Sequence, residues 1–396
     1  MFGLFGKPSH KEFAKIILAA ARRAGITGDF IFDEPEFTLK KDKARFFLGN
    51  VYDDYCRANR AHKETLLGNF ISGMIPMRRQ TREDALGSAV AVLRERALFS
   101  FTDLRASAQD MPLLQVAFEP ISEWFARCIV LDSPGSMRLV GVGDLKEWNL
   151  TFDELFAVGL ERLRAATQPK FQAKNGFLVG HWRDDYDSSR ILLPELYQEL
   201  AIDGDPVFCI PNRLTLLVGD SARPDAVAAM IAKAEQIVQN ETRRQNHSPL
   251  TYRGNRLTDF TAGAGSPLYR PVQRANGLSA SMYYSEQAVP LEALQKKTGK
   301  DTHIAKFAFN ERKDGSYYSY SVWSSGVPAL LPKTDLVVFL DPAKPEPERI
   351  VARVKWADVE ASAGDLMLDA GTFPARFYVS TFPSVALFDS MPKYEA

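Results

Sequence analysis

The segment from Asp184 to Leu192 places four charged side chains between two apolar runs of different character. The run before it, residues 176–182, is short and strand-like, and the run after it begins near Ser188 and is helix-like. A chain that turns from a strand into a helix leaves backbone groups that polar side chains can satisfy. Binding and catalytic residues are also often placed at such junctions. The segment therefore predicts a turn in the topology and marks a candidate site.

Signals for helices and for paired strands are mixed along the first 240 residues. Ser9 with Glu12 and Thr151 with Glu154 form capping boxes, Pro224 suits a first helical turn, and Asn50 is expected to cap one long helix that reaches Met74. The expected strand pairs are 30–32 with 37–39, 113–118 and 125–131 with 137–142, and 207–210 with 214–218. This mixture predicts an α+β fold of mostly antiparallel sheets packed by amphipathic helices.

The composition of the chain changes near residue 240. Residues 241–265 are polar and rich in Gly, Arg and Asn, which is typical of a linker or a long loop. The pattern beyond them is mainly that of strands, with a hairpin signal at Lys313-Asp314-Gly315 and further strand runs at 336–340, 350–354 and 375–379. We therefore predict an α+β region at 1–245, with a sub-boundary near 76–81, and a β-rich C-terminal domain of unknown role at 246–396.

The charge and cysteine content restrict the classes of function. Among 396 residues, Lys+Arg and Asp+Glu both number 49, so a general nucleic-acid-binding role is not expected, because it needs an excess of positive charge. The three cysteines, Cys56, Cys128 and Cys209, lie far apart in apolar surroundings, which is typical of a reducing cytoplasm. No apolar run approaches the roughly 20 residues of a membrane span. We expect a cytoplasmic protein without a membrane partner.

Two stretches of the chain together carry a family resemblance: Leu48-Gly49-Asn50-Val51-Tyr52 at the start of the expected long helix, and the charged segment Asp184 to Leu192. They resemble the YtpQ-like family, an uncharacterised bacterial family whose pattern at the charged segment is close to D-x-Y-D-A-S-R-I-L, with Ser188 here in place of Ala. The resemblance covers about residues 13–240 and leaves the C-terminal part outside. It implies a bacterial α+β domain, and it supplies neither a reaction nor a catalytic residue.

The charged segment is open to three interpretations. Asp184, Asp185 and Asp187 could hold a divalent cation, with His181 as a base for phosphoester hydrolysis and Asp185 and Asp187 as the metal-ligand candidates. In the structural interpretation, Asp187 caps the helix that starts at Ser188, Arg190 pairs with an Asp side chain, and the Tyr186 ring packs. In the third interpretation, Tyr186 and Arg190 belong to a surface that binds a ligand or partner.

A second candidate for binding is the aromatic run from Tyr317 to Trp323. In a strand, Tyr318 and Tyr320 would share one face, which could receive a partner or form an ordinary cross-strand ladder. The chain lacks H-E-x-x-H, G-x-S-x-G and P-loop patterns, and no cofactor or metal is evident from it. We therefore predict a non-enzymatic protein that binds a protein partner, forms a homo-oligomer or belongs to an assembly. The alternative is a metal-dependent phosphoester hydrolase centred on Asp184–Asp187.

Overall fold

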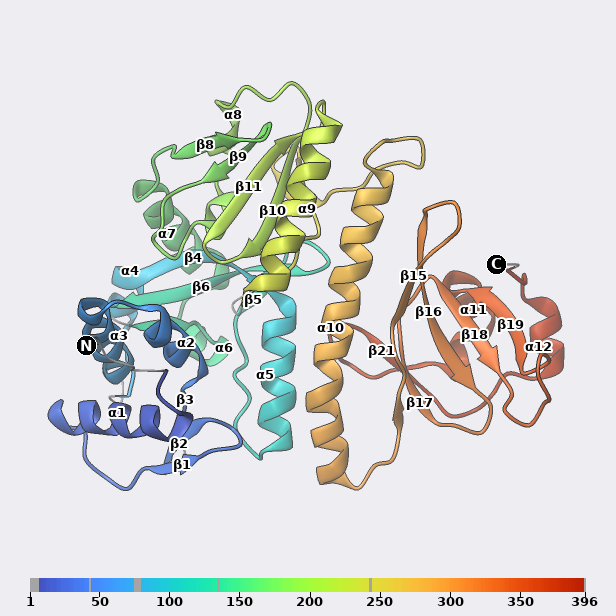
Figure 1. Ribbon diagram of the computed structural model, residues 1–396, viewed down its shortest axis with the longest axis horizontal. Helices are drawn as coiled ribbons and strands as arrows, with labels where there is room; N and C mark the ends of the chain where they lie inside the picture. Colours follow the sequence, from blue (N-terminus) through green and yellow to red (C-terminus); the bar gives the residue numbers. More distant parts are fainter. Residues whose placement is uncertain (1–6, 43, 75–79, 134–135, 242–243, 395–396) are drawn as a thin grey trace, which may run out of the picture. The chain divides into compact units, whose positions relative to one another are not determined.

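The computed structural model describes residues 7–42, 44–74, 80–133, 136–241 and 244–394 (Figure 1). Helices and several mostly antiparallel sheets confirm the predicted α+β class. The chain forms two compact units, of which the first contains Met1–Val90, Ile129–Val140 and Asp144–Arg162 and the second Ala91–Cys128, Gly141–Gly143 and Leu163–Ala396. This division differs from the predicted border at 245/246, and the predicted sub-boundary near 76–81 lies mostly outside the described residues.

No helix in the described ranges is both long and apolar enough to cross a membrane.

The first unit begins with a helix that packs on a three-stranded antiparallel meander. Helix α1 (His10–Arg23) has the predicted Ser9–Glu12 capping box, and strands β1 (Ile31–Asp33), β2 (Thr38–Lys41) and β3 (Ala44–Phe47) follow it in order. The predicted helix from Asn50 to Met74 is wrong, because two helices form, α2 (Gly49–Arg57) and α3 (Arg60–Ser72). Ala58 between them is extended, and Asn59 accepts a hydrogen bond from the backbone N–H of His62, so it starts a second helix.

Strands β4 (Ala89–Glu95) and β6 (Phe125–Ser133) each contribute residues to both units. They belong to one sheet with β5 (Phe118–Pro120) and β7 (Ser136–Leu139). The predicted strand 113–118 is wrong for most of its length, since only Val116 forms an isolated bridge before β5. The neighbouring helices are α4 (Arg82–Ser88), α5 (Arg96–Ala108), α6 (Val142–Trp148) and α7 (Phe152–Ala165), the last with the predicted Thr151–Glu154 capping box.

The second unit contains a six-stranded antiparallel sheet in the order β13-β12-β10-β11-β9-β8. Its strands are β8 (Phe171–Lys174), β9 (Phe177–Gly180), β10 (Pro206–Asn212), β11 (Thr215–Asp220), β12 (Leu250–Arg253) and β13 (Arg256–Asp259), and α9 (Pro224–Asn240) packs on it. The prediction of a linker at 241–265 is therefore wrong where β12 and β13 pair. The turn between them uses Gly254 at φ 60°, a conformation that glycine adopts without strain.

Helix α10 (Tyr269–Thr298) contains 30 residues and lies within the region 246–396, for which the sequence predicted mainly strands and no such helix. It contacts α5 and α9 as well as β15 (Ala308–Glu311) and β16 (Tyr317–Ser324), so several of its sides are covered (Figure 1). Its buried positions include the polar residues Ser279 and Gln287. A helix that is covered on several sides and has polar residues among its own buried positions shows no simple apolar stripe in its sequence. The sequence pattern therefore did not indicate it.

The strands after α10 form two four-stranded sheets. One has the order β15-β16-β18-β19, with β18 (Leu336–Leu340) parallel to β16, and the other has the order β14-β17-β21-β20. The remaining elements are β14 (His303–Ile304), β17 (Ala329–Pro332), β19 (Ile350–Lys355), α11 (Trp356–Ala363), η2 (Gly364–Leu366), β20 (Leu368–Asp369), β21 (Arg376–Val379) and α12 (Val385–Ser390).

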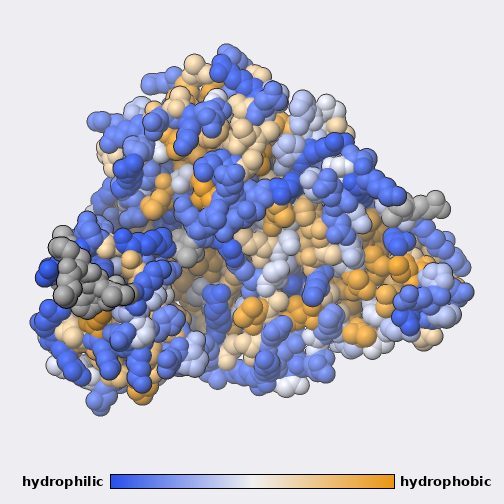
Figure 2. Space-filling view, viewed as in Figure 1, coloured by the Kyte–Doolittle hydropathy of each residue, from blue (hydrophilic) through white to orange (hydrophobic). Residues whose placement is uncertain are grey.

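Trp323, Phe339 and Trp356 lie in the hydrophobic core of this region. The predicted strands at 336–340, 350–354 and 375–379 and the hairpin at Gly315 are confirmed. On the face drawn in Figure 2, hydrophobic residues gather among polar ones over the strands of this region.

Candidate functional site

The charged segment from Asp184 to Leu192 closes on a fully buried arginine. Arg190 is 0% exposed, and its Nη1 and Nη2 atoms donate to Oδ1 and Oδ2 of Asp184 at 2.7 and 2.5 Å. Its Nε atom donates to the Thr167 hydroxyl at 3.0 Å, and its guanidinium lies 4.6 Å from the centre of the Trp182 ring. The predicted pairing of Arg190 with an Asp side chain is therefore observed, and it is bidentate, the strongest geometry for such a pair.

Asp187 is buried, but it does not cap the short helix that follows. Residue 187 already has helical backbone angles, and its carboxylate turns back to accept hydrogen bonds from the backbone N–H groups of Trp182, Arg183 and Asp184 at 3.0, 3.2 and 3.3 Å. The predicted helix cap is wrong, because these three donors of the preceding turn occupy the carboxylate. The 3-10 helix η1 (Ser188–Leu192) instead follows with no side-chain cap.

The other members of the proposed catalytic set do not converge with this pair. Asp185 and His181 are exposed, and Asp185 has a positive φ of 67°, a left-handed conformation that is uncommon outside glycine. Burial raises the pKa of Asp184, but the hydrogen bonds and the charge of Arg190 outweigh burial and lower it overall. Among the described residues, no group of three or more His, Cys, Asp or Glu residues could hold a metal ion.

The carboxylates of Asp184 and Asp187 are thus occupied by Arg190 and by backbone donors. Tyr186 is half-buried, and its backbone N–H donates to Asp184 Oδ1 at 3.1 Å, so it belongs to the same turn. A metal-dependent hydrolase would need these oxygens for a cation and a water. The contacts therefore favour the structural interpretation of the segment over the catalytic one.

The aromatic strand β16 has the predicted alternation. Ser319, Ser321 and Trp323 are buried, whereas Tyr318 and Tyr320 lie half-exposed on the other face with their rings stacked at 6.1 Å. The guanidinium of Arg312 lies 4.3 Å from the centre of the Tyr318 ring, and Arg312 also donates to the Tyr394 hydroxyl at 3.2 Å. The face of Tyr318 and Tyr320 is therefore continuous with a cationic group.

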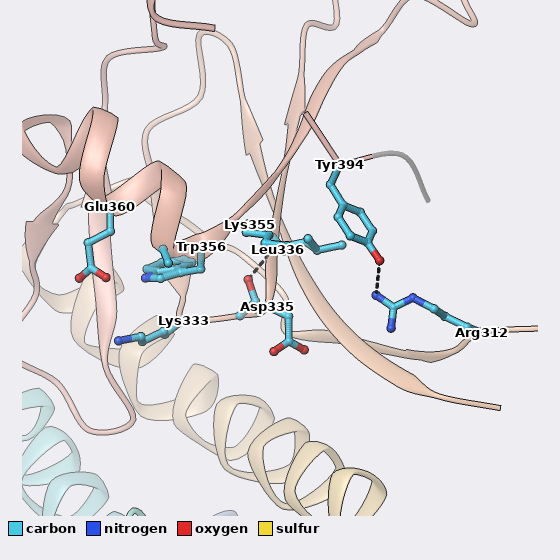
Figure 3. Close-up of a pocket in the computed structure, with 10 residues that line it drawn as sticks. Arg312, Lys333, Asp335, Leu336, Lys355, Trp356, Glu360 and Tyr394 are labelled. Atoms are coloured by element: carbon cyan, nitrogen blue, oxygen red, sulfur yellow. Dashed lines mark hydrogen bonds between the residues drawn. The ribbon is translucent and has the colours of Figure 1, made fainter. Parts of the chain in front are cut away.

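Arg312 also lines a cavity of about 600 Å³, which we call the basic pocket (Figure 3). Its other charged and aromatic lining residues include Lys333, Asp335, Lys355, Trp356 and Tyr394. Figure 3 shows Lys333 and Trp356 on one side of the pocket and Arg312 with Tyr394 on the other. The pocket is thus walled by groups that are more than 80 residues apart in the chain.

Hydrogen bonds from β16 hold the Lys333–Asp335 loop, which lines the basic pocket. Asp335 Oδ2 accepts from the backbone N–H of Ser319 at 2.7 Å and from its hydroxyl at 2.8 Å. The backbone carbonyl of Asp335 accepts from the backbone N–H of Trp356 at 2.9 Å, and the hydroxyls of Thr334 and Ser321 are hydrogen-bonded at 3.1 Å. Because this loop has its own bonds, it presents neighbouring side chains in a fixed arrangement.

The charge of the basic pocket is positive on balance. Arg312, Lys333 and Lys355 form no salt bridge with any described residue, whereas the Asp335 carboxylate already receives two hydrogen bonds. Glu360 is the other carboxylate at the rim. Trp356 is 4% exposed, and its indole N–H has no hydrogen-bond partner among the described residues. Such a pocket can accept an anionic group beside aromatic surface.

The sequence predicted the aromatic strand, but it did not indicate Lys333, Lys355 or Trp356 as lining residues of a pocket. Lys333, Lys355 and Trp356 stand in no motif, and their meeting depends on the pairing of β18 with both β16 and β19. The only local signal is the charged residue at the end of each strand run, and this is common in surface loops.

Neither a protein-family model nor a curated protein nor a solved structure matches the chain significantly.

Proposed function

We propose that this protein is a non-enzymatic binding component that holds an acidic segment of a protein partner in the basic pocket. The observation that carries the proposal is the set of three cations, Arg312, Lys333 and Lys355, around a cavity in which Oδ2 of Asp335 already accepts two hydrogen bonds. Because these cations form no salt bridge among the described residues, they are available to the carboxylates of another chain. Pairs at a solvent-exposed rim contribute modestly to affinity and strongly to the rate of encounter.

The surface beside the pocket supports a peptide rather than a small anion. Arg312 connects the pocket to the half-exposed rings of Tyr318 and Tyr320, so cationic and aromatic groups lie along one face of β16. Aromatic and arginine side chains are enriched at the centres of protein interfaces. A partner segment with alternating acidic and apolar residues would match this order of groups.

We further infer from the sequence a cytoplasmic location and a YtpQ-like relationship for about residues 13–240. The three cysteines suit a reducing compartment, and Asp184, Asp187 and Arg190 match the family pattern. The basic pocket lies outside the region of that resemblance. The binding role proposed for it therefore rests on its own contacts.

Binding should be measured by fluorescence anisotropy with the full chain. The probe is a labelled peptide of alternating glutamate and leucine, and the matched peptide contains glutamine in place of glutamate. The acidic peptide should bind at least about tenfold more tightly at low salt, and the difference should shrink as salt screens the rim charges.

The variant Lys355→Glu reverses an exposed charge of the pocket and should weaken binding of the acidic peptide by about tenfold or more. Lys344→Glu is the matched control, since Lys344 is exposed and does not line the pocket. Equal affinity for the two peptides, or equal loss in the two variants, would overturn the proposal. A single-stranded DNA oligonucleotide that binds more tightly than the acidic peptide would also overturn it.

A further inference from the structure

A second cavity, of about 510 Å³, lies beside the Lys333–Asp335 loop in the same unit, and we call it the aromatic cleft. Trp124, Phe307, Phe309 and Tyr317 contribute its aromatic walls, and Glu123 and Asp259 contribute carboxylates. The volume is within the range of pockets that hold small organic molecules. The chemistry of the lining differs from that of the basic pocket, although the two share one loop.

The aromatic walls are held in place by other rings and by the backbone of α10. Trp124 stacks on Tyr283 with 4.9 Å between ring centres, and Phe309 stacks on Tyr317 at 5.5 Å. Phe309 also lies against Gly277 so closely that a Cβ atom there would come within 1.9 Å of its ring. Glycine inside a helix costs stability relative to alanine. Gly277 therefore makes room for this wall of the cleft.

The carboxylates of the cleft have no cation bound directly to them among the described residues. Asp259 Oδ2 accepts from the backbone N–H of Glu123 at 2.8 Å, so the two acids are neighbours. The guanidinium of Arg96, whose charge acts on both acids, donates to the backbone carbonyls of Ser122 and Glu123 and lies 4.0 Å from the Phe373 ring centre. Neither Glu123 nor Asp259 forms a salt bridge in the described part of the chain.

The surroundings of these acids disfavour their charged forms. Partial burial raises the pKa of Glu123, and Arg96 and Lys333 offset this only in part, while the charge of Asp259 raises it further. Burial also raises the pKa of Asp259 against the hydrogen bonds that lower it. A partly desolvated carboxylate pair gains most when a cation approaches it.

We propose that the aromatic cleft binds an organic cation, an ammonium group attached to an apolar body. The ammonium would lie at Glu123 and Asp259, and the body would pack between Trp124, Phe309 and Tyr317. The carboxylates attract the ammonium and the rings bury the apolar body, so both parts of the lining act on the same class of ligand. Lys333 also lines the cleft and can receive a carboxylate, so zwitterionic amines belong to this class. This site is independent of the peptide-binding role proposed for the basic pocket.

The test uses probes of nearly equal shape on the full chain, with binding measured by titration calorimetry. Phenethylamine should bind with a Kd of about 1 mM or tighter, as expected for a ligand of its size, and 2-phenylethanol at least about tenfold more weakly. Tighter binding of phenylalanine than of phenethylamine would support the cation requirement and add a contact to Lys333. Equal affinity for the amine and the alcohol, or tighter binding of 3-phenylpropionate, would overturn the proposal.

The variant Glu123→Gln removes one charge from the lining of the cleft and should weaken phenethylamine binding by about fivefold or more. Glu292→Gln is the matched control, because Glu292 is exposed on α10 and does not line the cleft. Asp259→Asn is a second variant, and its melting curve shows whether it folds. Unchanged binding in Glu123→Gln would overturn the proposal, whatever the result with the acidic peptide.

Discussion

Replacement of Arg190 by alanine tests whether the charged segment is a structural element or a surface site. The side chain is 0% exposed and donates to Asp184 through both terminal nitrogens, to Thr167 through Nε, and covers the Trp182 ring. Arg190→Ala therefore removes an ion pair, a hydrogen bond and buried volume together. A surface site would lose none of these on the same change.

The expected loss of unfolding free energy is about 3 kcal/mol. Breaking a fully buried ion pair costs about 3–5 kcal/mol, because the remaining charge has no partner. The Asp184 side chain is 41% exposed, so its carboxylate can be hydrated again, and this places the charge cost at the lower end. The space left by the arginine adds a cavity cost like that of other large-to-small changes in a core.

The assay is urea unfolding followed by circular dichroism, with Arg190→Met, Asp184→Asn and the double variant completing a thermodynamic cycle. Arg190→Met retains most of the volume and separates the cavity cost from the charge cost. Arg349→Ala is the control, because Arg349 and Glu346 are 47% and 77% exposed in their ion pair, and such pairs contribute about 0–1 kcal/mol. A loss below about 1 kcal/mol for Arg190→Ala would refute the structural interpretation.

The pH dependence gives an independent check on the same pair. The pKa of Asp184 is lower in the folded state than in the unfolded state, so the contribution of the pair is present above the unfolded pKa. It is lost as the pH falls through the lower folded pKa. The difference in stability between the wild type and Arg190→Met should therefore shrink in acid, and a difference that stays constant would contradict the pairing.

Three further changes test other parts of the fold by the same unfolding measurement. Gly277→Ala should destabilise by about 1–3 kcal/mol because of the clash with Phe309, whereas Gly68→Ala, at a helical glycine with open space, should be neutral or stabilise by up to about 1 kcal/mol; equal effects would contradict the close packing. Burial lowers the pKa of His247 to about 4, so the folded state should lose up to about 3 kcal/mol between pH 6.5 and 4, and His247→Gln should show a smaller loss over that range. Arg376→Met should cost more than about 2 kcal/mol, because this buried guanidinium donates to three backbone carbonyls and to a glutamine, and a neutral result would mean that these acceptors find other donors.

Features decided by short stretches of chain were predictable from the sequence. The capping boxes at Ser9 and Thr151, the helix that starts at Pro224 and the hairpin at Gly315 all occur where the residues indicate them. Their stabilising contacts join residues a few positions apart, so the local sequence contains the whole interaction. The Gly254-Asn255 pair is a hairpin signal of the same kind, and it lies within the stretch 241–265 that was predicted as a linker or long loop.

Features decided by contacts on several sides were not predictable in this way. Asp187 was expected to cap a helix, and three backbone donors from the preceding turn take its carboxylate instead. Helix α10 has polar residues such as Gln287 in its buried face, because Arg376 from a distant strand donates to that side chain. A partner so far along the chain leaves no periodic pattern around either residue.

The sequence by itself determined the α+β class and the strand alternation of Tyr318 and Tyr320, and it gave the pairing of Arg190 with an aspartate as one of three interpretations. The class follows from the mixture of helix and strand signals along the chain, whereas the alternation and the pairing follow from residue type and spacing within one segment. Only the tertiary structure decided which charged side chains of the described residues lie together without a salt bridge. Glu123 and Asp259 are 136 residues apart, and Lys355 meets Arg312 only through the pairing of β15, β16, β18 and β19. Both candidate binding sites consist of residues that are distant in the sequence and close in the fold. The burial of apolar surface determines how the sheets pair, and this pairing sets the positions of the charged side chains.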